Sequence, residues 1–95
     1  MERVLLIDDM RNIKADRVCR TFDEGLKALR DDGPWDVLLL DHDLGDKNPR
    51  KTGYDLLVFL EEYPRYLPKQ IRLVTQNPVG VEKMTKLIDA LYGRT

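Results

Sequence analysis

The stretch from Trp35 to Gly45 constrains the fold more than any other part of this chain. The residues from Val37 to Leu40 are all apolar, and the run stops abruptly at Asp41, His42 and Asp43. A short run that is apolar at every position is typical of a strand covered on both faces, as in a parallel sheet with helices on either side. Because burying a free carboxylate is costly, we expect these polar residues to lie where the strand leaves the core, at the carboxyl edge of the sheet.

The bulk composition argues against some classes of partner. The chain has 95 residues and a formal net charge of -1, which gives no reason to expect a nucleic acid polymer or an anionic membrane. Its single cysteine, Cys19, cannot form an internal disulfide, and no apolar run approaches the roughly 20 residues that a membrane-spanning helix needs. We therefore expect one domain over residues 1–95, soluble and cytoplasmic, with neither a nucleic acid polymer nor a membrane as partner.

Three further strands are expected. Arg3–Ile7 is a second apolar run and, like the central one, it ends in acids, here Asp8 and Asp9. Residues 10–16 are polar and too short for a crossover helix, so we predict a loop, followed by an edge strand over Arg17–Thr21. The fourth strand is predicted over Gln70–Gln76.

Three helices alternate with these strands. Each is expected to begin at a residue that caps helix amino termini, and two of them have an acidic residue three positions later, as in a capping box. The predicted helices start at Thr21, Thr52 and Asn77 and stop before Gly33-Pro34, at Tyr63 and at Gly93. Alternating strands and helices imply right-handed crossovers and a parallel sheet. The predicted fold is a small α/β three-layer sandwich with about four strands and three helices.

Polar residues follow three of the predicted strands. They are Asp8-Asp9, Asp41-His42-Asp43 and Thr75-Gln76-Asn77. In a parallel sheet these ends converge on one edge, where several carboxylates repel one another unless a cation is present. Oxygen-only ligands favour a hard ion such as Mg²⁺ together with a phosphate. The Thr75 hydroxyl and free amides near Gly80, at the start of the last helix, could hold that phosphate beside the metal.

These motifs resemble the receiver domain of response regulators, which has a flavodoxin-like fold. The closer resemblance is to a receiver-like family described as cyclic-phosphate-processing receivers. Its shared motifs stand here as Asp8-Asp9, Asp41 to Gly45, Thr52 to Asp55, and Asn77 to Gly80 followed by Met84. The resemblance implies Mg²⁺ bound by Asp8, Asp9 and Asp41, phosphoryl acceptance by Asp41 in receivers proper, contact from Thr75, and a cyclic phosphate or nucleotide ligand in signalling.

The chain departs from the receiver pattern in two places. The first receiver helix is lost between Asp9 and Arg17, and a fifth strand ending in a lysine is missing, with Lys83 and Lys86 poor replacements by position. The resemblance then implies a phosphorylated Asp41 lacking one of its usual counter-charges. The fourth strand is left as an open edge, so we expect that this strand or the last helix could hold a second copy of the chain or a protein partner.

Several candidate residues have two readings. His42 could act as a general acid or base, or it could pack at the back of the sheet, because it faces away from Asp41 in an extended chain. Thr75 could bind phosphate or simply end a strand, and Asn77 is foremost a helix cap. Among basic residues, Arg50 and Lys51 border the site by sequence and are preferred over Arg3 and Arg11 as contacts for an anion.

Three functional hypotheses follow. In the first, Asp8, Asp9 and Asp41 hold Mg²⁺, Asp43 or His42 orients or activates water, and the residues near the phosphate are Thr75, Asn77, Gly80 and Lys51. The domain would then bind a small phosphate-containing ligand and could be a metal-dependent phosphoesterase. In the second, Asp41 is a phosphoacceptor. In the third, the domain is a non-catalytic module that binds a nucleotide or a protein.

Overall fold

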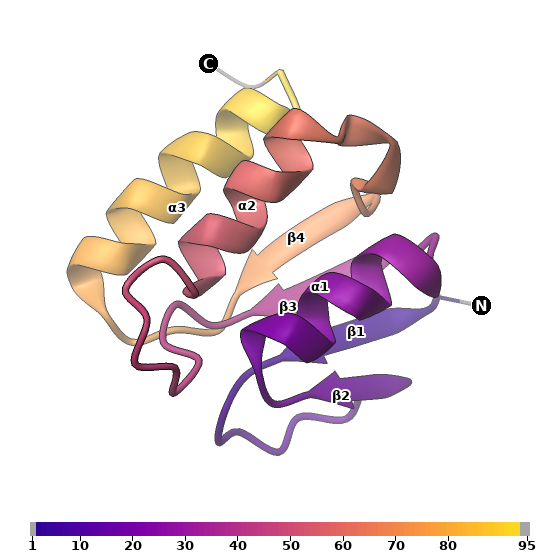
Figure 1. The fold of residues 1–95 in the computed structure, drawn as a ribbon. Coiled ribbons are helices and arrows are strands. Elements are labelled where there is room, and N and C mark those ends of the chain that lie inside the picture. The colour runs from indigo at the N-terminus through magenta and orange to yellow at the C-terminus, as the bar shows by residue number, and fades with distance from the viewer. Residues whose placement is uncertain (1, 94–95) are drawn as a thin grey trace.

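Four parallel strands form one sheet in the computed structural model, which describes residues 2–93 (Figure 1). They are β1 (Val4–Ile7), β2 (Arg17–Cys19), β3 (Val37–Leu40) and β4 (Gln70–Leu73), in the spatial order β2-β1-β3-β4. The register pairs Ile7 with Leu40, and Leu40 with Leu73. The strands therefore end at the same level, and the segments that follow them meet along one edge of the sheet.

The three helices begin where the capping residues predict. α1 (Phe22–Asp31) starts after Thr21, α2 (Gly53–Glu62) after Thr52, and α3 (Pro78–Leu91) after Asn77, each of which accepts hydrogen bonds from backbone N–H groups of the first turn. Thr52 and Asp55 form a complete capping box. The predicted box at Thr21 is half formed, because the Glu24 carboxylate accepts from the N–H of Arg20. A short 3₁₀ helix, η1 (Pro64–Tyr66), follows α2.

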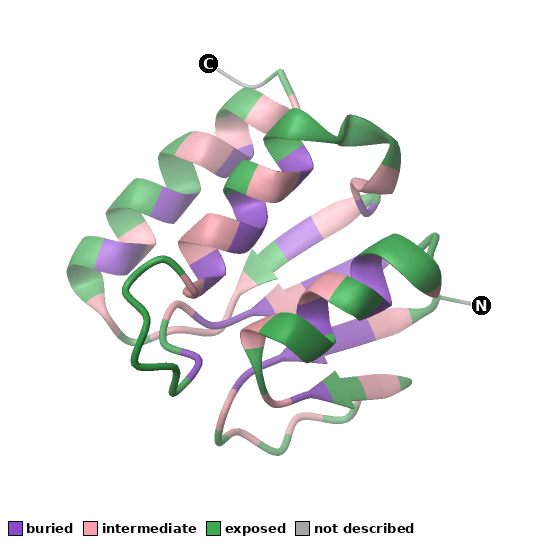
Figure 2. Ribbon diagram, in the orientation of Figure 1, coloured by how far each residue is buried: buried purple, intermediate pink, exposed green. Residues whose placement is uncertain are grey.

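The main core lies between the sheet and the helices, where Figure 2 shows the buried residues gathered. Side chains of a strand alternate between its two faces, so Leu5 and Ile7 of β1 and Leu38 and Leu40 of β3 meet the helices. On α2, Gly53, Leu56, Leu57 and Leu60 are buried. On α3, Met84 and Ile88 are buried, whereas Val81, Leu87 and Leu91 are only partly buried.

All three helices lie on one face of the sheet (Figure 1). A right-handed crossover from β1 to β2 places the connection of residues 8–16 on the opposite face. Leu6 points to that face and is fully buried, while Val18 on β2 remains 39% exposed. The expected arrangement with helices on both faces is therefore not formed within residues 2–93: on the second face the connection of residues 8–16 is irregular, because it is too short and polar to form a helix.

The predicted α/β class, with a parallel sheet of four strands and three helices, is confirmed in residues 2–93. The strands are shorter than expected at their ends: β2 stops at Cys19 and β4 at Leu73. The loop predicted over residues 10–16 is also confirmed. Across the described part of the chain, no helix has both the length and the apolar character needed to cross a membrane.

Candidate metal and phosphate site

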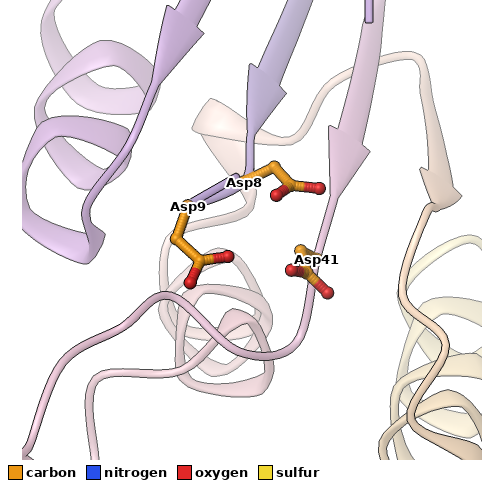
Figure 3. Close-up of side chains that lie close together, drawn as sticks. All are labelled: Asp8, Asp9 and Asp41. Carbon is orange, nitrogen blue, oxygen red and sulfur yellow. The ribbon is translucent and has the colours of Figure 1, made fainter. Parts of the chain in front are cut away.

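Three carboxylates meet at the carboxyl edge of the sheet. Asp8 and Asp9 follow β1, and Asp41 follows the neighbouring strand β3. The strand hydrogen bonding continues one residue further, because the N–H of Asp41 donates to the carbonyl of Ile7 over 3.0 Å. One oxygen from each of the three carboxylates lies within 4.8 Å of the others (Figure 3). The expected convergence of the two acidic segments is therefore present in the fold.

Asp8 is held as an anion by the turn that follows it. Its side chain is fully buried, its Oδ1 accepts from the N–H groups of Met10 and Arg11 over 2.9 Å, and its Oδ2 lies 3.1 Å from the Arg11 Nη1. Burial by itself would raise the pKa of Asp8. The hydrogen bonds from the two backbone amides and the Arg11 guanidinium outweigh that effect and lower the pKa below its usual value.

Asp41 is in the opposite situation. Burial raises the pKa of its carboxyl group, and the nearby negative charge of Asp8 raises it further. A hydrogen bond with the Thr75 side chain, the N–H of His42 at 2.8 Å and the charge of Arg11 oppose this shift without cancelling it. Asp41 is therefore a carboxylate whose negative charge is incompletely compensated, which is the condition that a bound cation would relieve.

Arg11 is the residue that sequence reasoning ranked too low. Its Nη1 lies 3.1 Å from Asp8 Oδ2 and 3.6 Å from Asp41 Oδ2, so one guanidinium spans both buried acids. The Asp8 side chain accepts from the N–H groups of Met10 and Arg11, which closes a tight turn directly after β1. An arginine three residues after an aspartate at a strand end was the available signal.

A cleft of about 490 Å³ opens beside the carboxylates. Its other walls come from the segment after β4, with Thr75, Gln76 and Asn77, and from the exposed Asp43. Asn77 also caps α3, because its Oδ1 accepts from the N–H groups of Val79 and Gly80 over 3.1 Å each. Those amides, which were expected to be free for a phosphate, are therefore already engaged.

The family of this chain can be read from a comparison with known proteins. Residues 3–90 match the family described as the cyclic-phosphate processing receiver domain. The chain belongs to the cyclic-phosphate processing receiver family. No protein with a curated description matches the chain.

One solved structure shows the same fold. It is a fusion protein that joins the yeast Spc42 trimeric coiled coil, amino acids 181–211, to another structure. This fusion is similar to the chain with a TM-score of 0.64 and 13% sequence identity. The match covers 90% of this receiver domain and 61% of that chain. At this level of identity the likeness concerns the fold alone.

Three predicted site residues of the receiver domain lie outside the cleft lining. His42 turns toward α3: a Cβ on Gly80 would lie 2.8 Å from the His42 ring, and its Nδ1 is 3.0 Å from Asp43 Oδ1. Gly80 thus contributes close packing beneath that ring. Lys51, which was preferred over Arg11 as a contact for an anion, pairs with Asp23 of α1, its Nζ 3.0 Å from Asp23 Oδ2, whereas Arg11 lines the cleft.

A glycine allows α2 to approach the site closely. The N–H of Gly53 donates to the carbonyl of His42 over 2.8 Å. A Cβ at position 53 would overlap the carbonyl oxygen of Asp41 and would lie 2.9 Å from its carbonyl carbon. The start of α2 therefore packs directly against the backbone of Asp41, and this close approach requires glycine at position 53.

The side chains of the receiver domain fit a hard divalent cation. Each buried acid commits one oxygen to backbone amides and directs the other toward Arg11 and the cleft. Asp9 adds a third carboxylate, less buried than the other two. An all-oxygen donor set that is open on one side is the arrangement Mg²⁺ prefers, because this ion retains waters and binds phosphate alongside carboxylates.

Proposed function

We propose that this domain binds Mg²⁺ through Asp8, Asp9 and Asp41 and hydrolyses a cyclic phosphate or cyclic nucleotide bound in the adjoining cleft, as part of signalling. The observation that carries the proposal is the convergence of three carboxylate oxygens within 4.8 Å of one another beside an open cleft. Membership of the cyclic-phosphate processing receiver family supports the class of ligand.

The cleft residues have distinct roles in this proposal. A bound Mg²⁺ would supply Lewis-acid polarisation of a phosphoryl oxygen. Thr75, which is hydrogen-bonded to Asp41, would place its hydroxyl against the phosphate. Asp43 lines the cleft with its side chain 66% exposed and would accept a proton from the water that attacks phosphorus. As that P–O bond forms, one ring P–O bond breaks, and the leaving alkoxide oxygen takes up a proton from solvent. His42 would orient the Asp43 carboxylate by a hydrogen bond from its Nδ1.

Metal binding is tested first, by isothermal titration calorimetry with Mg²⁺. The wild type is expected to release or absorb measurable heat, and Asp9→Asn and Asp41→Asn should each weaken binding by about tenfold or more because each removes a charged ligand. Asp31→Asn, a surface change on α1, is the matched control and should leave the affinity unchanged. Absence of any heat in the wild type would refute the proposal at its first step.

Turnover is tested separately with 2′,3′- and 3′,5′-cyclic AMP, using phosphorus NMR to follow ring opening. A monophosphate should form only when Mg²⁺ is present, and Asp43→Asn should slow its formation while leaving Mg²⁺ binding intact. Cyclic nucleotide that binds but stays unchanged would show that the domain is a binding module and that the hydrolytic part of the proposal is wrong.

A phosphoacceptor role is the second candidate function. It is favoured by the placement of Asp41, whose Oδ2 lies 3.6 Å from Arg11 Nη1 and whose side chain is hydrogen-bonded to Thr75. Incubation with acetyl phosphate and Mg²⁺, followed by intact mass measurement, decides this case. An added phosphoryl mass that disappears in Asp41→Asn would establish it, and an unchanged mass would exclude it.

A further inference from the structure

The oxygens of Asp8 and Asp41 that face the cleft share one cationic partner. Arg11 Nη1 is 3.1 Å from Asp8 Oδ2 and 3.6 Å from Asp41 Oδ2, whereas the Oδ1 atom of each acid accepts from backbone amides. The guanidinium thus contacts the same oxygens that a divalent cation shared by the two acids would need. A cation bound to both oxygens would lie close to the Arg11 guanidinium, and repulsion between the two positive charges favours withdrawal of Arg11.

The backbone and the side chain of Arg11 are held differently. Its N–H donates to Asp8 Oδ1 over 2.9 Å, and its carbonyl accepts from Arg20 Nη1 over 2.6 Å. The side chain is 31% exposed and borders the cleft. The guanidinium can therefore change partners by side-chain rotation while the loop stays in place.

The charge balance favours such an exchange when metal is added. Three carboxylates face a single guanidinium, so the site carries excess negative charge and repels an anion. A divalent cation offsets more of that charge than Arg11 does. A guanidinium released at the edge of the cleft is also well suited to a phosphate, because its planar donors match phosphate oxygens in pairs.

We propose that Arg11 is a displaceable counterion, which yields the oxygens of Asp8 and Asp41 to the divalent cation and then binds the phosphate in the cleft. This inference rests on the proposed function and specifies its order of binding: metal first, phosphate second. Because coupling between two ligands is reciprocal, bound phosphate also increases the affinity for the metal.

Arg11→Ala distinguishes this role from a purely structural one. In calorimetry, its Mg²⁺ affinity should rise several-fold, because the competing cation is gone. With Mg²⁺ saturating, its affinity for inorganic phosphate should fall by about tenfold or more, because a charge-assisted contact is lost. Lys14→Ala, an exposed change in the same connection, should alter neither affinity. A Mg²⁺ affinity that stays equal or falls, or an unchanged phosphate affinity, overturns the inference.

A measurement on the wild type makes the test independent of how the variant folds. In ¹⁵N-labelled protein, the Arg11 Nε–Hε signal, assigned by its loss in Arg11→Lys, should shift on Mg²⁺ saturation and shift again when inorganic phosphate is added. Mg²⁺ binding with an unmoved Arg11 signal overturns this inference alone. Absence of Mg²⁺ binding in the wild type refutes the proposed function itself, so the two failures are distinguishable.

Discussion

At the scale of single residues, Asp8 and Asp41 are neighbours with opposite electrostatic environments. Asp8 accepts hydrogen bonds from two backbone N–H groups and lies 3.1 Å from Arg11 Nη1, so its pKa is lowered despite burial. Asp41 accepts a hydrogen bond from one backbone N–H group and lies farther from Arg11 Nη1, at 3.6 Å. Burial together with the charge of Asp8 raises its pKa. The pair therefore contains one carboxylate that stabilises the fold when ionised and one whose ionisation opposes it.

Asp41→Asn is expected to stabilise the metal-free domain at neutral pH. The raised pKa of Asp41 means that the folded state holds its proton more tightly than the unfolded chain does, so ionisation costs stability as pH rises through the folded pKa. Below the unfolded value near 3.8 both states are protonated and the cost vanishes. Urea denaturation in EDTA, followed by the fluorescence of the buried Trp35, should show a gain in the variant at neutral pH that disappears in acid. A loss of stability at neutral pH would contradict this.

Asp8 should show the reverse dependence on pH. Its lowered pKa contributes stability above the unfolded value near 3.8, and that contribution is lost as pH falls through the lower folded pKa. Urea denaturation of the Asp41→Asn variant at decreasing pH should therefore show a fall in its free energy of unfolding in strong acid. Asp36 and Asp31 contribute to the same loss, because hydrogen bonds from Arg3 and Arg30 also lower their pKa values.

The acids of the site were predictable from sequence because charge cannot remain inside an apolar strand. Asp8 and Asp41 had to lie at strand ends, and parallel strands bring those ends together. The basic residue was not predictable in the same way. Lys51 is nearer to Asp41 along the chain than Arg11 is, but the loop after β3 carries it to Asp23 on α1. Arg11 reaches both acids through a tight turn whose direction depends on backbone hydrogen bonds.

At the scale of secondary-structure elements, the start of α2 fixes the backbone of the site. Gly53 places its N–H 2.8 Å from the carbonyl oxygen of His42, and a Cβ there would also lie 3.0 Å from Met84 Cε of α3. The close approach involves backbone atoms of the loop after β3, which cannot rotate away as a side chain can. The contact therefore couples the docking of α2 to the position of Asp41.

Gly53→Ala should lower the free energy of unfolding by about 3 kcal/mol, the upper end of the usual range for overpacking, because the added Cβ collides with backbone. It should also weaken Mg²⁺ binding, because the Asp41 backbone has to move. Val58→Ala, on the exposed face of the same helix, is the control and should change stability by no more than about 0.5 kcal/mol. Urea denaturation measures both, and equal stabilities of the two variants would show that the helix start can shift without cost.

The positions of the elements were predictable, and their ends less so. The apolar runs and the capping residues Thr52 and Asn77 place strands and helices correctly, because burial and capping are local requirements. The sequence could not show that the helices share one face of the sheet, since this depends on the directions of successive crossovers. The predicted strand over Gln70–Gln76 ends at Leu73, because beyond that point the chain turns toward the cleft and α3.

At the scale of the whole molecule, residues 8–16 join the site to the second face of the sheet. Arg20, just after β2, holds this connection with three hydrogen bonds. Its Nη1 donates to the carbonyls of Asp8 and Arg11, and its Nη2 donates to Asn12 Oδ1. At its far end, Asp16 Oδ2 accepts from the N–H of Val4 over 2.7 Å. These bonds replace the regular hydrogen bonding that a crossover helix would have supplied.

Arg20→Ala should destabilise the domain by roughly 1–2 kcal/mol, because it removes several charge-assisted hydrogen bonds at a partly buried site. Hydrogen–deuterium exchange should increase over residues 10–16, and Mg²⁺ affinity should fall because the backbone of Asp8, a proposed metal ligand, loses its hydrogen bond from Arg20. Arg30→Ala, which removes an exposed pair with Asp31, should change stability by no more than about 0.5 kcal/mol. Exchange rates that match those of the wild type would show that the connection is held by other contacts.

The pairing of Ile7 with Leu40 has a consequence for how this domain could be altered. Asp8 and Asp41 each come one residue after that pair, so the spacing between them is set by the distance between adjacent strands, about 4.8 Å. Insertions or deletions in the exposed segment of residues 45–50 leave this spacing unchanged. The length of that loop is therefore free to vary in an engineered domain while the acidic pair keeps its geometry.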